Sequence, residues 1–204
     1  MIALIPGLLT GLSLIIAIGA QNAYVIRQGL ARDNVLLVVL FCALSDALLI
    51  VLGASGLGAL IQAAPDLLEL IRWFGVIYLS WFGIKSLRSA MKSQSLEIGE
   101  NVSRENRTSK RKVVATVFAL TYLNPHVYLD TVIFLGSIAN QFTEDKWFFV
   151  TGAALGSFLW FFTIGFGAKK ASRFMSRPIF WKILDFIIAA VMFTVAIILA
   201  LYSF

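Results

Sequence analysis

The sequence consists mainly of six long apolar runs separated by shorter polar segments, at residues 2–26, 35–61, 67–84, 113–139, 147–168 and 179–202. A membrane-spanning helix needs about 20 apolar residues, and each run is close to that length or longer. Apolar residues are continuous rather than alternating, which disfavours the strands of an outer-membrane barrel. The pattern therefore predicts an all-α polytopic membrane protein with six transmembrane helices.

The composition agrees with this interpretation, because 59% of the 204 residues are hydrophobic and 14% are charged. An ordinary soluble domain has about 45–50% apolar and about 25% charged residues. A soluble enzyme, a disordered chain and a secreted disulfide scaffold are therefore excluded. The single cysteine, Cys42, is expected to pack as a small apolar residue within a span. The first run lacks the basic start and cleavage site of a signal peptide, so we expect it to be a span as well.

Lysine and arginine are distributed unevenly among the connections between the runs. The connections after the first, third and fifth runs carry 15 of the 17 basic residues, and the other connections carry 2. Cytoplasmic connections of membrane proteins are enriched in Lys and Arg. The asymmetry predicts a multi-pass protein of the inner (cytoplasmic) membrane with both termini outside. The net charge of +6 then reflects topology, and nucleic acid is not an expected partner.

The order of the runs suggests two related halves. Three runs, a polar cytoplasmic loop at 92–112 and three more runs predict one transporter domain with half repeats at about 1–91 and 113–204. An odd number of spans in each half places the halves in opposite orientations, as in many secondary transporters. The spacing from Asp33 to Ser45 equals that from Asp145 to Ser157, at twelve residues. These features predict a 3+3 inverted repeat about a pseudo-twofold axis in the membrane plane.

Small residues and span-end charges are expected to serve packing and solvation. Close helix contact is predicted at Gly53, Gly56 and Gly58 in the second run and at Gly152 and Gly156 in the fifth. Charged side chains near the ends of spans can reach the membrane surface, and this interpretation is given to Glu69, Arg72, Lys182 and Asp185. The substitution Asp185→Asn is accordingly expected to leave activity almost unchanged. Trp160 lies deep in the fifth run, where packing is favoured over stacking on a ligand.

Two carboxylates lie inside apolar runs, Asp46 in the second and Asp130 in the fourth. A carboxylate at the centre of the bilayer costs about 2.5–3.5 kcal/mol on insertion scales, and such residues usually face the bundle interior or a wet cavity. No basic residue is near either aspartate in sequence. We therefore predict that both are functional. The alternative is a protonated aspartate that only hydrogen-bonds a neighbouring helix.

The fourth run contains the pair Asn124-Pro125, which must kink or break a helix because proline lacks an N–H and its ring clashes with the preceding turn. The carbonyl of Thr121 and other freed backbone groups must then be satisfied by protein, water or ligand. With Asp130 five residues later, this break is a candidate cation site. A similar polar break is expected at residues 19–22 in the first run. Helix N-termini at such breaks attract anions, including a substrate carboxylate.

The only histidine, His126, follows the proline directly. Together with Asp46 and Asp130 it would make a thin ligand set for a metal ion, so no metal site and no cofactor are expected. Two interpretations remain for His126, a helper in proton movement and a satisfied interior histidine.

Two motifs connect these residues to a known family. The segment at residues 18–29, IGAQNAYVIRQG, resembles the first-helix signature of the LysE/ArgO family of lysine and arginine exporters. The segment at residues 123–131, LNPHVYLDT, resembles that family's fourth-segment signature more closely. The segments at 45–46, 71–75 and 176–178 also look like the family. One departure is Ala20, because the family usually has proline after the glycine.

The resemblance implies an inner-membrane exporter of L-arginine and/or L-lysine, driven by the membrane potential or the proton gradient. It also implies that Asp46, Asn22, Asn124 and Asp130 belong to the pathway of substrate and protons. The full predicted pathway adds five neighbouring residues, namely Gln21, Pro125, His126, Ser45 and Tyr128. The alternatives are an exporter of another small cation, such as a metal ion, and an integral-membrane enzyme. Membrane lipid surrounds the protein, and a homodimer is left open.

The residues suggest how such a substrate is handled. A basic amino acid carries two cationic groups and one carboxylate. The two aspartates can pair with the cations, while Asn22 or Asn124 and free backbone amides hold the carboxylate. Protonation of the aspartates after release would neutralise them for the return step, which gives a hypothesis of proton antiport. Some coupling or a steep gradient is needed, because moving one charge against the membrane potential costs about 2.3 kcal/mol per 100 mV.

Overall fold

The structure is a computed structural model that describes residues 2–16, 19–57, 65–91, 109–171 and 178–201. Every regular element in these ranges is helical, which confirms the all-α prediction. The elements in chain order are α1 (Leu4–Ile15), α2 (Ala20–Ala31), α3 (Val35–Leu52), the π-helical η1 (Gly53–Leu57), α5 (Pro65–Met91), α6 (Lys110–Tyr122), α7 (Pro125–Val127), the π-helical η3 (Tyr128–Phe134), α8 (Leu135–Gln141), the 3₁₀-helical η4 (Thr143–Asp145), α9 (Lys146–Ala171) and α10 (Pro178–Leu201).

Three helical segments of the described chain are long and apolar enough to cross a membrane by themselves, Val35–Leu57, Thr143–Lys170 and Ile179–Leu201. The pair α1 and α2 passes the same test when it is taken together, and its two helices are bent by 85°. Apolar spans of this kind indicate a membrane protein. The total of six spans stays a prediction.

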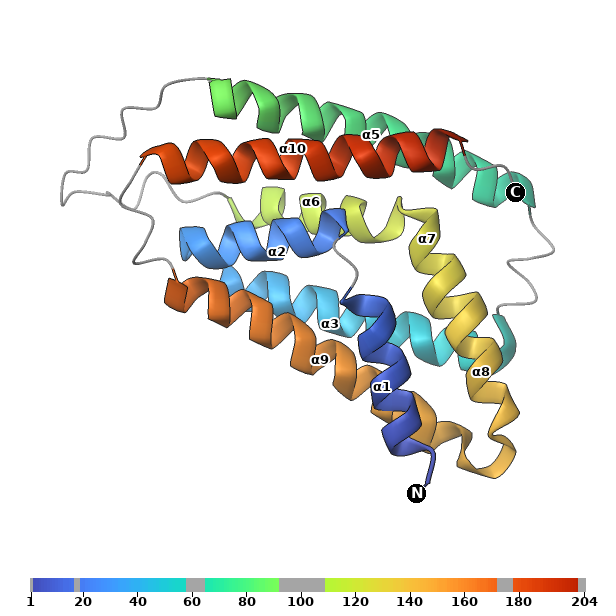
Figure 1. Ribbon diagram of the computed structural model, residues 1–204. Helices are drawn as coiled ribbons and strands as arrows, with labels where there is room; N and C mark the ends of the chain where they lie inside the picture. The colour runs from blue at the N-terminus through green and yellow to red at the C-terminus, as the bar shows by residue number, and fades with distance from the viewer. Residues whose placement is uncertain (1, 17–18, 58–64, 92–108, 172–177, 202–204) are drawn as a thin grey trace.

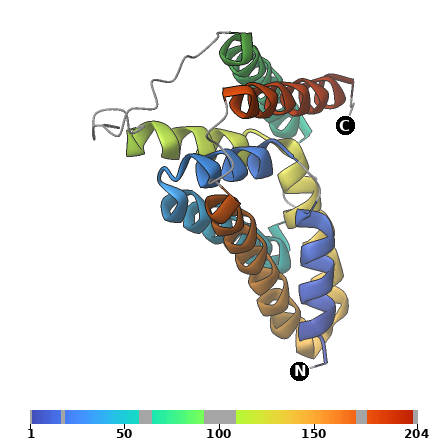
Figure 2. The ribbon, with the colours of Figure 1, turned by 60° about the vertical axis from the view of Figure 1, so that its left-hand side comes forward.

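The helices form layers that are visible in two views (Figures 1 and 2). The long helices α5 and α10 pack along each other, and α3 packs against α9. Between these two pairs lie α2 and α6, whereas α1 packs against α9 and α8 packs against η1 at one end of the molecule. This arrangement brings the breaks between α1 and α2 and between α6 and α7 toward the middle of the fold.

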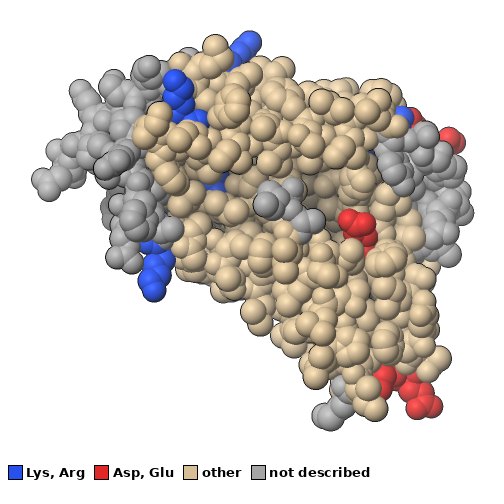
Figure 3. All heavy atoms as spheres, in the orientation of Figure 1, with Lys and Arg blue, Asp and Glu red and all other residues tan. Residues whose placement is uncertain are grey.

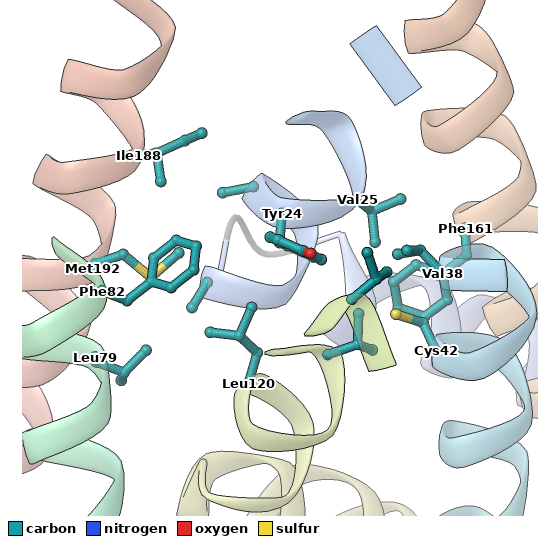
Figure 4. Close-up of a cluster of buried hydrophobic side chains, with 14 of the residues drawn as sticks. Tyr24, Val25, Val38, Cys42, Leu79, Phe82, Leu120, Phe161, Ile188 and Met192 are labelled. Atoms are coloured by element: carbon teal, nitrogen blue, oxygen red, sulfur yellow. The ribbon is translucent and has the colours of Figure 1, made fainter. Parts of the chain in front are cut away.

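An apolar cluster fills the space between the layers (Figure 4). It includes Tyr24 of α2, Cys42 of α3, Leu120 of α6, Phe161 of α9 and Met192 of α10, all of them buried. Side chains from helices far apart in sequence therefore meet in one core. Cys42 is fully buried in this cluster, which confirms the prediction for it.

Glycines of α9 and η1 allow the backbones of these elements to approach neighbouring helices closely. A Cβ atom at Gly152 of α9 would lie 2.0 Å from the carbonyl oxygen of Leu4 in α1, and one at Gly156 would lie 3.1 Å from that of Leu8. A Cβ atom at Gly53 would lie 2.4 Å from the carbonyl oxygen of Val132. These contacts confirm the packing role predicted for the three glycines.

The same prediction was wrong for Gly56, whose φ of 97° bends the chain and around whose Cβ position nothing lies within 4 Å. Such a positive φ is easily reached only by glycine, so this position serves a turn rather than helix packing. Gly58 lies outside the described residues.

Lysine and arginine side chains are concentrated at one end of the molecule. The ends of α2, α5 and α9 and the beginnings of α3, α6 and α10 lie together (Figure 1). Most Lys and Arg side chains in view in Figure 3 gather there. We call this the basic end, and the helix ends that lie there are joined by the connections predicted to be cytoplasmic.

Candidate functional site

The break in the fourth run begins at the pair Asn124-Pro125, as predicted. Helix α6 ends at Tyr122, and Pro125 takes the first position of α7, where a missing N–H costs nothing. The side chain of Asn124 caps the new helix by accepting a hydrogen bond from the backbone N–H of His126 at 3.2 Å. The hydroxyl of Tyr128 donates to the carbonyl oxygen of Tyr122 at 2.9 Å. Two backbone groups released by the break are thus satisfied by residues of the motif itself.

A second break separates α1 from α2. Gly19 is extended, with φ −103° and ψ 177°, and α2 begins at Ala20. The side-chain amide of Asn22 donates to the carbonyl oxygen of Ile15 at the end of α1, at 2.8 Å. Its oxygen accepts a hydrogen bond from the indole N–H of Trp160 at 3.3 Å. Asn22 therefore ties the first break to α9, and the break forms although Ala20 replaces the proline usual in the family.

Both breaks border one cavity of about 310 Å³, within the range typical of small-molecule sites. Its lining combines a polar and an apolar part. The polar side chains are Gln21, Asn22, Asp46, Asn124, His126, Asp130 and Thr131, and the large apolar ones are Leu14, Ile15, Val127, Phe161, Val195 and Ile198. Figure 3 shows acidic atoms beside a hollow in the middle of the molecule. The fold thus brings Asp46 and Asp130 to a common cavity, although they are 84 positions apart in sequence (130 − 46).

The two aspartates have different surroundings within this cavity. Asp46 is 6% exposed, and its Oδ2 accepts a hydrogen bond from the Ser157 hydroxyl on α9 at 2.8 Å. Asp130 lies in the π-helical segment η3 and is exposed toward the cavity. No lysine or arginine is among the cavity-lining residues of the described chain. Because two carboxylates share a site without a basic partner in its lining, the cavity is suited to a cation.

Three of the predicted pathway residues do not line the cavity. Pro125 is buried at the break, and Ser45 is buried on α3 beside Asp46. The hydroxyl of Tyr128 instead donates its hydrogen bond to the carbonyl oxygen of Tyr122. Sequence reasoning missed the contact of Ser157 with Asp46 and the hydrogen bond from Trp160 to Asn22, having favoured packing for Trp160 over stacking on a ligand. The one signal for Ser157 was its equivalence to Ser45 in the two twelve-residue spacings.

The interpretation of Asp185 and Arg72 as surface-reaching span-end charges was wrong. Asp185 is 5% exposed, and its Oδ1 lies 3.1 Å from a guanidinium nitrogen of Arg27 on α2. Its Oδ2 accepts a hydrogen bond from Ser89 of α5 at 2.6 Å. Arg72 is 6% exposed and forms an ion pair with Glu69, one turn earlier on α5. The partners of Asp185 come from other helices, so a sequence window around it could not reveal them.

Within the described part of the chain, no group of three or more His, Cys, Asp and Glu residues is placed to hold a metal ion. His126 lines the cavity near Asp130, but the two carboxylates and the imidazole do not form such a group.

Comparison with known proteins identifies the relatives of this chain. The family model described as LysE type translocator matches residues 12–203. The chain belongs to this family. Membership in this family and the apolar helices together indicate an integral membrane transporter. The family match also confirms the resemblance seen in the two motifs.

Similarity to individual members of the LysE type translocators extends over almost the whole chain. The chain is 40% identical over 197 residues to the putative amino-acid transporter YggA of Aeromonas salmonicida. This alignment covers 96% of this chain and 94% of that protein. It is 37% identical over 214 residues to the lysine exporter LysE of Corynebacterium diphtheriae, covering 92% and 94% of the two chains. The lysine exporter LysE of Corynebacterium glutamicum is 35% identical over 223 residues, with 95% and 96% covered. No solved structure matches the chain.

Proposed function

We propose that this protein exports basic amino acids, L-arginine and/or L-lysine, across the cytoplasmic membrane. The observation that carries the proposal is the cavity between two helix breaks, whose described lining contains two aspartates and no lysine or arginine. The relatives named as lysine exporters support the substrate class. The protein acts as a transporter and not as an enzyme.

The chemistry of the cavity suits each part of such a substrate. Asp46 and Asp130 offer one carboxylate for the α-ammonium group and one for the cationic end of the side chain. The first N–H groups of a helix lack intrahelical partners and attract anions, and the N-terminus of α2 at Ala20 lines the cavity, where it can hold the substrate carboxylate. Val195 and Ile198 of α10 provide apolar contact for the aliphatic stem.

Proton antiport would avoid the free-energy cost of leaving the carboxylates of Asp46 and Asp130 charged and unpaired after the substrate has left. With substrate bound, the carboxylates are ionised and paired, and the Ser157 hydroxyl stabilises the charged form of Asp46. After the substrate leaves, protonation removes the charge and permits the return step. His126 is the candidate to assist this proton movement, because it lines the same cavity.

Alternating access between two halves is the structural part of the proposal. The halves are about 1–91 and 113–204, three spans each, joined by the polar loop at 92–112, most of which lies outside the described residues. Reciprocal packing supports an inverted repeat: α3 contacts α9, α5 contacts α10, α1 contacts α9, and α8 contacts η1 at the end of α3. The basic end faces the cytoplasm and both termini face outward, as the distribution of Lys and Arg favours. A homodimer remains compatible with the proposal.

Counterflow in proteoliposomes tests the proposed function. Vesicles loaded with unlabelled arginine should accumulate labelled arginine, and excess lysine should compete. Citrulline is the matched control, because it has nearly the shape of arginine without the side-chain charge, and it should not compete. Movement of a divalent metal ion without amino-acid counterflow would favour a metal exporter, and chemical conversion of arginine without counterflow would favour an enzyme.

A further inference from the structure

An ion pair between a buried aspartate and a half-buried arginine joins three helices on the side of the cavity toward the basic end. Asp185 of α10 uses both carboxylate oxygens: Oδ1 lies 3.1 Å from a guanidinium nitrogen of Arg27 on α2, and Oδ2 accepts from Ser89 on α5 at 2.6 Å. The Asp185 side chain is 7% exposed and that of Arg27 29% exposed. Removing one partner of a buried ion pair leaves an uncompensated charge. Asp185 therefore links α10 to α2 through Arg27 and to α5 through Ser89.

The order of residues along α2 shows how the Arg27–Asp185 pair lies relative to the cavity. Gln21 and Asn22 line the cavity at the start of the helix. Tyr24 and Val25 follow and are buried in the apolar cluster of Figure 4. Arg27 comes next, about 10 Å from the start of the helix at 1.5 Å per residue. Passing from the cavity toward the basic end, one meets polar lining, an apolar layer and then the ion pair.

Helix α10 repeats this order in the opposite chain direction. Val195 and Ile198 line the cavity, Met192 and Ile188 are buried in the apolar cluster, and Asp185 lies beyond them. Along both helices the apolar cluster therefore lies between the cavity and the Arg27–Asp185 pair.

Helix α2 is flanked on both sides by residues with non-helical backbone angles, and it packs against α9 as well as α10. Gly19 precedes it in extended conformation, with nothing within 4 Å of where its Cβ would lie. Arg32 and Asn34 follow it with φ of 53° and 48°. In contrast, α5 and α10 pack along each other and are joined by the bond between Ser89 and Asp185. The Arg27–Asp185 ion pair is therefore a contact across which α2 would separate from α5 and α10.

We propose that Arg27 and Asp185, supported by Ser89, are the lock of a gate that closes the cavity toward the basic end. The lock opens during each transport cycle when α2 moves away from α5 and α10. This role rests on the proposed transport function, and it assigns Asp185 and Ser89 as positioning residues that act through Arg27 and α2.

Thiol labelling tests the gate without any substrate. The reporter is Thr131→Cys in a Cys42→Ala background, because Thr131 lines the cavity. An impermeant thiol reagent is applied from the side on which Ser109→Cys reacts, since Ser109 is exposed beside α6 at the basic end. Asp185→Asn and Arg27→Gln should each accelerate labelling of the reporter, and exchange of the two charges, Arg27→Asp with Asp185→Arg, should slow it again. Lys182→Gln is the matched control, an exposed charge on the preceding turn of α10, and should leave the rate unchanged.

Crosslinking tests whether the lock must open. Arg27→Cys with Asp185→Cys is joined by a short bifunctional thiol reagent, and arginine counterflow is compared before and after the reaction. We expect counterflow to be lost after crosslinking and to return when a cleavable reagent is reduced. The control pair is Ser89→Cys with Asp185→Cys, which joins α5 to α10. Because this variant also lacks parts of the lock, its counterflow is compared with that of the same variant before the reaction, and crosslinking should not lower it.

Two outcomes would overturn the gate: reporter labelling that is as slow in Asp185→Asn as in the parent, or full counterflow by protein crosslinked between positions 27 and 185. Absence of arginine and lysine counterflow in the wild type would instead overturn the proposed function. The labelling experiment would still decide the gate in that case, because it needs no substrate.

Discussion

The hydrogen bond from Ser157 to Asp46 allows a quantitative test of the cavity. Ser157 is fully buried on α9, and its hydroxyl donates to Oδ2 of Asp46 at 2.8 Å. A hydrogen bond to a charged group contributes about 1.5–3 kcal/mol. Asp46 also lines the cavity, so water can replace part of the lost donor in Ser157→Ala, and the lower part of the range applies. Since about 1.4 kcal/mol is a factor of ten, we expect roughly tenfold weaker arginine binding.

The assay measures the half-saturating arginine concentration for counterflow and the thermal stabilisation of purified protein by arginine. Thr163→Ala is the matched control, because its hydroxyl lies on the same helix, is exposed and bonds only its own helix at the Leu159 carbonyl. This control should bind arginine normally. In an Asp46→Asn background, Ser157→Ala should have little further effect, because the charge that the hydroxyl supports is already absent.

Normal arginine binding by Ser157→Ala would refute the idea that this hydroxyl stabilises a charged Asp46. Equal weakening with and without the Asp46 carboxylate would refute it as well, since the effect would then come from packing on α9. Size-exclusion chromatography of each variant separates both outcomes from misfolding.

Three further predictions concern the acids, the helix contacts and the topology. Asp46→Asn and Asp130→Asn should insert normally but lose export or its dependence on external pH; wild-type proton-coupled export by either variant would contradict the shared site. Gly136→Ala should lower thermal stability by about 1–3 kcal/mol through overpacking, because its Cβ would lie 2.5 Å from the backbone of Gly53, whereas Gly167→Ala meets nothing within 4 Å and should be tolerated. In a cysteine-free background, Ser109→Cys should react with impermeant reagents only from the cytoplasmic side, and labelling in intact cells would reverse the topology.

Local sequence determined the helical class and the two breaks. Apolar runs of membrane-spanning length predict helices wherever they occur, because every backbone group in a lipid environment must be satisfied within the chain. Pro125 predicts a break at its own position, since its ring and missing N–H act on the preceding turn. The structure confirms that break, and adds that Asn124 and Tyr128 satisfy the freed groups. The cost of buried charge likewise marked Asp46 and Asp130 as residues that face a cavity.

Tertiary packing decided which residues meet. Asp46 and Asp130 line one cavity, and Asp46 accepts a hydrogen bond from Ser157, only because α3, η3 and α9 converge. Asp185 looked like a span-end charge, yet the fold buries it beside Arg27 from a helix in the other half of the chain. Periodicity, composition and proline chemistry act over a few residues and can be read along the chain. The partner of a buried charge depends on which helices pack together, and that is set by the complementary shapes of surfaces distant in sequence.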